Sequence, residues 1–75
     1  GKDLKDALNF IDSALNKIPE NFRYGLLKAK ILAKMNNYKE ALVVIEEANN
    51  WAKNKNNANY IEQTRLFWDS LLTKK

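Results

Sequence analysis

The sequence repeats itself with a period of 34 residues, and this repeat constrains the fold more than any other feature of the chain. When the segment 36–48 is shifted back by 34 positions, its apolar residues fall on those of the N-terminal segment. The aligned pairs are Tyr38/Leu4, Ala41/Ala7, Leu42/Leu8, Ile45/Ile11 and Ala48/Ala14. A fixed period of this length is typical of stacked helical hairpins, in which each unit leaves an apolar face for its neighbour to cover. The repeat therefore predicts an all-α chain.

Length and residue usage limit the chemistry that this chain can perform. Its 75 residues predict one small domain, residues 1–75, too small for a large enclosed active-site cavity. The chain contains no cysteine and no histidine, which excludes disulfides, thiolate metal sites and hydrolase triads built on histidine. The longest unbroken aliphatic run, residues 41–45, is far shorter than the roughly 20 residues of a membrane span. Gly1 is typical of a cloning remnant, so we expect the chain to be a fragment of a longer protein.

Apolar residues at three- and four-residue spacing predict four helices, over about 3–17, 22–35, 38–52 and 60–72. The third should be the most buried. Phe10 lies off the apolar stripe of the first helix, which predicts that this helix is contacted on two sides. Gly25 falls inside the second helix, where glycine costs roughly 0.5–1 kcal/mol relative to alanine. We therefore expect a neighbouring helix to approach closely at Gly25.

Asparagines mark the breaks between the helices. Pro19 ends the first helix, and Asn21 is expected to cap the second. Asn36-Asn37 predicts a turn, with Asn37 and Glu40 in the spacing of a capping box. The segment 53–57 has no apolar residue and is interpreted as the one true linker, after which Asn59 and Glu62 repeat the capping spacing.

The residues 19–48 resemble the tetratricopeptide repeat, a helix-turn-helix unit of 34 residues. The pattern of the family's second helix matches Tyr38, Ala41, Leu42, Ile45 and Ala48, Pro19 matches its closing proline, and Ala29 its small residue. The chain departs from the family pattern at Gly25, Lys28 and Asn36-Asn37. The resemblance implies four antiparallel helices forming about two repeats. A fainter resemblance, on residues 29–41 and the helices after them, is to the helical C-terminal tail of a bacterial family of unknown function.

The resemblance also implies a protein-interaction module that binds a peptide or partner segment on a concave face lined by the first helix of each hairpin. Carried over by position, that face comprises Arg23, Leu26, Lys30, Ala33 and Lys34 on the second helix and Tyr60, Thr64 and Phe67 on the fourth. Residues 23, 30 and 34 are separated by seven and four positions, so a helix brings these three cations onto one side. The expected partner is therefore an acidic or C-terminal-carboxylate peptide.

Other classes of function remain open from the sequence. The carboxylates of Asp12, Glu46, Glu47, Glu62 and Asp69 lie on polar helix faces, so we expect no catalytic residue, no enzyme activity, no cofactor and no metal. The main alternative is a purely structural or self-associating helical accessory domain of a larger protein. We expect weak homodimerisation or an exposed apolar face at the first helix, because that helix lacks a hairpin partner of its own. Nucleic-acid binding is not expected, because the 13 basic residues are scattered among 9 acidic ones.

Overall fold

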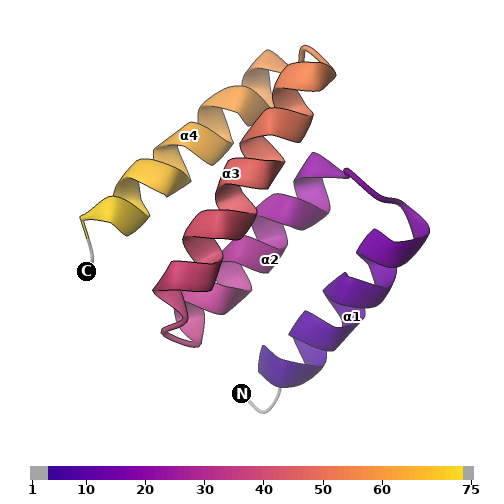
Figure 1. Ribbon diagram of the computed structural model, residues 1–75, viewed down its shortest axis with the longest axis vertical. Coiled ribbons are helices and arrows are strands. Elements are labelled where there is room, and N and C mark those ends of the chain that lie inside the picture. Colours follow the sequence, from indigo (N-terminus) through magenta and orange to yellow (C-terminus); the bar gives the residue numbers. More distant parts are fainter. Residues whose placement is uncertain (1–3, 74–75) are drawn as a thin grey trace.

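The computed structural model describes residues 4–73, which form four α-helices connected by short turns (Figure 1). The helices are α1 (Leu4–Lys17), α2 (Phe22–Lys34), α3 (Tyr38–Asn54) and α4 (Ala58–Leu72). Successive helices run in opposite directions, and residues 4–73 contain no strand. The all-α hairpin arrangement predicted from the sequence is confirmed. No helix in this part of the chain is long and apolar enough to cross a membrane.

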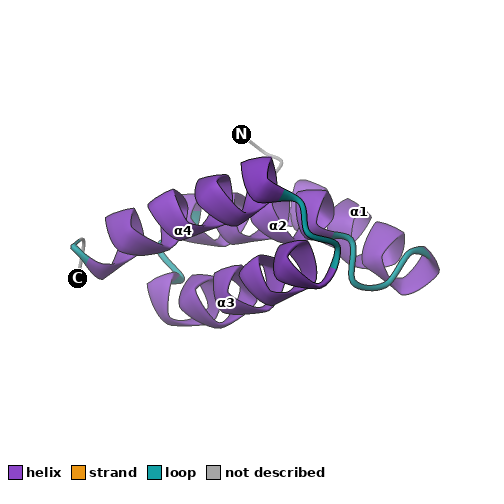
Figure 2. Ribbon diagram, turned by 90° about the horizontal axis from the view of Figure 1, so that it is seen from above, coloured by secondary structure: helices purple, strands orange, loops and turns teal. Residues whose placement is uncertain are grey.

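The helices form a flat slab with principal extents of 35 × 32 × 16 Å. Figure 2 shows α3 on one side of the slab and α2 and α4 on the other. α3 packs against both α2 and α4, whereas α1 packs against α2 alone within residues 4–73. As a result, α3 is held from two sides and α1 from only one.

The core lies where α3 meets α2. Ala41, Ile45 and Ala48 are fully buried, as their place in the repeat predicts, and they pack with Ala29 and Leu32 of α2. Small residues on both helices allow the backbones to approach closely. Leu42, which the pattern also predicts to be buried, is only half-buried because it lies at the rim of this cluster.

Gly25 lies where α2 packs closely against α3. A Cβ atom placed on Gly25 would lie 2.8 Å from the Cβ of Ala48 and 3.0 Å from Cζ3 of Trp51. The predicted close approach of a neighbouring helix is confirmed.

All three turns use the same local device, a left-handed residue followed by an asparagine that begins the next helix. The left-handed residues are Glu20 (φ 61°), Asn36 (φ 65°) and Asn56 (φ 55°). After α2, the N–H of Asn37 donates to the carbonyl of Leu32 (2.8 Å) and the N–H of Asn36 donates to Ala33 (3.0 Å). The turn after α3 has the same pair of backbone hydrogen bonds. This pair is the Schellman motif, which closes the C-terminal end of a helix.

Not all of the asparagines that follow the left-handed residues cap the next helix with their side chains. Asn21 caps α2 as predicted, because its Oδ1 accepts from the N–H groups of Arg23 (2.9 Å) and Tyr24 (3.1 Å). The predicted capping box at Asn37 is wrong, since its side chain accepts no such bond. The predicted cap at Asn59 is also wrong: Asn57 caps α4 by accepting from the N–H of Tyr60 (3.0 Å). Because the Schellman turn closes α3 at Asn54, only residues 55–57 connect it to α4.

Among the three left-handed residues of the turns, Glu20 alone is not an asparagine, and we expect its backbone to be strained. A left-handed conformation costs an ordinary L-residue about 1–2 kcal/mol, and asparagine tolerates it better. Glu20→Asn is therefore expected to raise the free energy of unfolding by about 0.5–1 kcal/mol in urea denaturation. Glu20→Ala removes the same charge without easing the backbone and serves as the control. Equal effects of the two substitutions would contradict strain at this position.

The first helix leaves an apolar side uncovered. Phe10 is 72% exposed and Ile18 is 52% exposed, while Leu4 and Leu8 are half-buried. The prediction that the first helix is contacted on two sides is wrong, because α1 touches α2 alone within the described residues. The exposed apolar face expected at the first helix is present. The predicted start of this helix at Asp3 lies outside the described residues.

Candidate functional site

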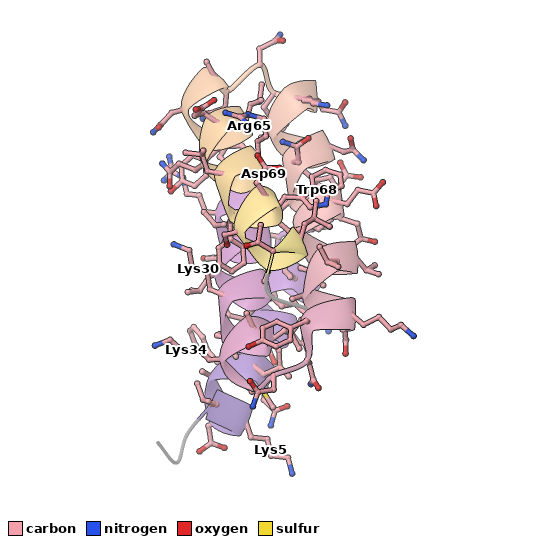
Figure 3. All side chains as sticks on the ribbon, turned by 90° about the vertical axis from the view of Figure 1, so that its left-hand side faces the viewer. Lys5, Lys30, Lys34, Arg65, Trp68 and Asp69 are labelled. Atoms are coloured by element: carbon pink, nitrogen blue, oxygen red, sulfur yellow. The ribbon has the colours of Figure 1, made fainter. Side chains whose placement is uncertain are left out.

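A shallow groove runs between α2 and α4 on the side of the slab opposite α3. Two hollows form it, and we use the name α2/α4 groove for the two together. Figure 3, which looks along the slab from the α4 side, shows Lys30 and Lys34 projecting from α2 away from α3. The groove therefore lies on the face that the sequence predicts for a partner.

Arg23 stands at one end of the groove, held over aromatic rings. The N-cap bonds of Asn21 and Asn57 fix the first turns of α2 and α4, and these turns bring Phe22 and Tyr60 together with ring centroids 5.0 Å apart. The guanidinium carbon of Arg23 lies 5.4 Å from the centroid of Tyr60 and 6.0 Å from that of Phe22. An arginine over a ring face gains about 0.5–1 kcal/mol at an exposed site. This contact limits the positions that the Arg23 side chain adopts.

The larger hollow, of about 500 Å³, lies at the other end of the groove. Its lining residues are Lys30, Ala33, Lys34, Asn36, Tyr38, Phe67, Ser70 and Leu71. The hydroxyl of Tyr38 donates to Oδ1 of Asn36 (3.2 Å), which fixes the ring at the mouth of the turn between α2 and α3. The hollow therefore combines an apolar floor with two ammonium groups on its rim.

The smaller hollow, of about 250 Å³, connects the two ends. It is lined by Arg23, Leu26, Leu27, Lys30, Tyr60 and Gln63. Lys30 lines both hollows, so the two are neighbours along α2. At about 1.5 Å per residue, Arg23 and Lys34 are about 16 Å apart along the axis of α2. That length matches about five residues of an extended peptide.

Within residues 4–73, the two hollows of the groove place cations together without an acidic lining residue. Neither hollow is lined by an aspartate or glutamate, and within residues 4–73 no ion pair involves Arg23, Lys30 or Lys34. Lys28 differs, because it faces α1 and its Nζ lies 2.7 Å from Oδ1 of Asp12. The groove therefore carries a local excess of positive charge.

On the outer edge of α4, by contrast, the cation is paired with acidic side chains. Arg65 lies 3.0 Å from a carboxylate oxygen of Glu62 and 3.2 Å from one of Asp69. Figure 3 shows Arg65 and Asp69 on the surface that α4 turns away from the slab. This edge is a solvated helix face whose three charges sum to −1, opposite in sign to the charge of the groove.

The predicted site residues come together in this groove with one exception. Arg23, Leu26, Lys30, Ala33, Lys34, Tyr60 and Phe67 line one or both hollows. Leu26 is only 6% exposed and contributes to the floor.

Thr64 is the exception, because it is fully buried and its inclusion in the predicted face is wrong. Its Oγ1 accepts from Nδ2 of Asn49 (2.9 Å) and donates to the carbonyl of Tyr60 (2.7 Å). Nδ2 of Asn49 also lies 3.2 Å from the carbonyl of Ile61. Buried polar groups are stable only when they are paired in this way. Thr64 therefore joins α4 to α3 and does not reach a partner.

Several residues of the groove were not predicted from the sequence. Gln63 and Ser70 follow Tyr60 and Phe67 at three-residue steps, so helical spacing could have placed them on the same face of α4. Tyr38 fits the apolar stripe of α3, which concealed its second role at the groove. The tight turn at Asn36, which folds Tyr38 back beside Lys34, was the available signal.

The lining of the groove contains no carboxylate. Its polar atoms are ammonium and guanidinium groups, a phenol, amides and a hydroxyl, and the Ser70 hydroxyl already donates to the carbonyl of Phe67 (2.9 Å). Within residues 4–73, no group of three or more metal-ligating side chains is placed to hold an ion.

Comparisons with known proteins do not add to this picture. No protein-family model matches the chain, and searches of curated proteins and of solved structures found no match. What the protein does must therefore be inferred from the α2/α4 groove itself.

Proposed function

We propose that this protein is a non-enzymatic interaction module, similar to the tetratricopeptide repeat, which holds an extended acidic peptide in the α2/α4 groove. The repeat similarity is supported by the period of 34 residues and by the alternation of helical hairpins. Placement of α2 and α4 side by side, with α3 behind them, is the arrangement that such repeats use to build a binding face (Figure 2).

One observation carries this proposal. Lys30 lines two hollows, and neither hollow is lined by an acidic residue. Cations at both ends and in the middle of a groove can bind carboxylates spaced along one peptide. Between the cations, Leu26 and Ala33 offer apolar surface for alternate side chains of an extended segment. An acidic segment with occasional apolar residues therefore fits the groove better than a neutral one.

The expected affinity is modest. Exposed ion pairs contribute about 0.2–1 kcal/mol each, and salt weakens them. Lys30→Glu/Lys34→Glu removes two such pairs, so the affinity should fall roughly 2- to 30-fold. Amide-shift titration with an acidic peptide of about six residues and a free C-terminal carboxylate measures this change. Shifts in the wild-type protein should centre on α2 and α4.

A matched variant separates the site from total charge. Lys5→Glu/Lys53→Glu makes the same change in net charge at exposed positions on α1 and α3, outside both hollows. This control should bind the peptide nearly as well as the wild-type protein at about 0.15 M salt, where charges are screened beyond about 8 Å. Equal loss in both double variants, or shifts centred on Glu46 and Glu47, would rule out the groove.

A purely structural, self-associating accessory domain is the second candidate. One observation favours it, the exposure of Phe10 and Ile18 on the free side of α1. It predicts no peptide shifts in the groove, so the same titration distinguishes the two functions.

A further inference from the structure

The side of α1 that faces away from the core carries an exposed aromatic ring, a hollow and two opposite charges. We use the name Phe10 flank for Asp6, Phe10, Ser13, Ala14, Lys17 and Ile18. The last five line one hollow of about 220 Å³ together with Tyr24 of α2, and Asp6 lies one helical turn before Phe10. The flank is separate from the α2/α4 groove, with which it shares no lining residue.

The hollow suits a single large side chain. Its volume lies below the roughly 300–1,000 Å³ of small-molecule sites, and its walls include the methyl of Ala14 and the ring of Tyr24. Phe10, at 72% exposure, is the largest uncovered apolar side chain of residues 4–73. A prominent ring thus lies beside a hollow that could accept an identical ring.

The charges of the flank favour an antiparallel orientation for a second copy of α1. Asp6 is exposed in the first turns of α1, and Lys17 is exposed at its end. They are eleven residues apart, or about 16 Å along the axis, which is too far for them to pair with each other. When two copies of α1 lie antiparallel, Asp6 of each copy meets Lys17 of the other. The same register places Phe10 against Ser13 and Ala14 of the second copy, and the helix dipoles also oppose each other favourably.

We propose that the Phe10 flank is a self-complementary interface through which two copies of this chain form a weak, antiparallel, two-fold dimer. Each copy inserts Phe10 into the hollow of the other, and two Asp6–Lys17 pairs set the register. A two-fold contact of this kind uses the same patch on both copies and closes on itself. Head-to-tail stacking onto α4 is disfavoured, because the outer edge of α4 carries the solvated pairs of Arg65 with Glu62 and Asp69 (Figure 3).

Sedimentation velocity over about 10 µM to 1 mM protein tests the interface. The wild-type chain should change from monomer to dimer across this range, with no larger species. Phe10→Ser should weaken the dimer at least about tenfold, because a buried aromatic anchor dominates such contacts. Leu66→Ser removes another exposed apolar side chain, 53% exposed, from α4 and should leave dimerisation unchanged. Thermal unfolding of each variant verifies that the monomer remains folded.

Charge reversal tests the antiparallel register. Asp6→Lys and Lys17→Asp should each weaken the homodimer, because they place like charges opposite one another at both pairs. An equimolar mixture of the two variants should restore a heterodimer, since each lysine then meets an aspartate. Mixing cannot repair a folding defect, so recovery reports the contact itself.

Four outcomes would overturn the proposal. A wild-type monomer at about 1 mM would show that the flank does not mediate dimerisation. Equal weakening by Phe10→Ser and Leu66→Ser would place the contact elsewhere. Failure of the mixture to recover would exclude the antiparallel register. Species larger than a dimer would exclude a closed two-fold contact.

Discussion

Ile45→Ala is expected to lower the free energy of unfolding by about 2–5 kcal/mol, the usual cost of truncating a fully buried isoleucine. Ile45 is 0% exposed in the core between α2, α3 and α4. At about 0.05–0.15 kcal/mol per residue, a domain of this length has roughly 4–11 kcal/mol of stability in total. The substitution should therefore remove a large share of it.

Urea denaturation measures this loss as a shift of the midpoint at constant slope. Val43→Ala, at a 56% exposed position on the same helix, is the control and should change stability by less than about 0.5 kcal/mol. A loss under about 1 kcal/mol for Ile45→Ala would contradict the central position of this residue.

The repeat supplies a second comparison. Ile11 occupies the position of Ile45 in the N-terminal copy and is 2% exposed, but it packs at the interface of α1 and α2 alone. A cavity near one free helix collapses more easily than one enclosed by three helices, and the cost of truncation depends on that relaxation. Ile11→Ala should therefore cost less than Ile45→Ala. Truncating the same residue type at the same repeat position would then lower the free energy of unfolding by two different amounts. The number of neighbouring helices would set the difference.

Periodicity was sufficient to predict the helices, because amphipathic spacing directly reflects burial on one side. Ala41, Ile45 and Ala48 are buried as this logic requires. The segment 54–59 was harder, since it contains four asparagines, each able to cap a helix. Asn57 becomes the cap because Asn56, directly before it, has a left-handed backbone that ends α3. That backbone conformation in turn depends on the hydrogen bonds accepted by the last carbonyls of α3. Side-chain preference alone could not distinguish Asn57 from Asn59.

The candidate site was predictable where spacing alone decides the face. The seven- and four-residue steps between Arg23, Lys30 and Lys34 place all three along one groove. Thr64 was misplaced because a small polar residue can enter the core when a neighbouring helix offers a partner. Asn49 is that partner, fifteen residues earlier on α3. Only the packing of α3 on α4 shows that the two side chains meet.

Substitution of Gly25 should have the second large effect. We expect glycine to be more stable here than alanine, the reverse of their helix propensities. At an exposed helix position, alanine is about 0.8–1 kcal/mol more favourable than glycine. A Cβ at Gly25 would approach the Cβ of Ala48 to 2.8 Å, and this methyl has no rotamer by which to move away. Overpacking of a core costs about 1–3 kcal/mol, which outweighs the propensity gain. We therefore expect stability to fall from glycine to alanine by up to about 2 kcal/mol and further at valine.

Chemical denaturation of wild type, Gly25→Ala and Gly25→Val tests this order. Gly25→Ala/Ala48→Gly transfers the methyl group from α3 to α2, so it should recover part of the loss although it places a new glycine in a helix. The recovery would locate the strain at the contact of residues 25 and 48. A gain in stability for Gly25→Ala would show that α2 and α3 separate at low cost. It would also remove the packing reason for glycine at this position, which is the close contact with Ala48 and Trp51 of α3.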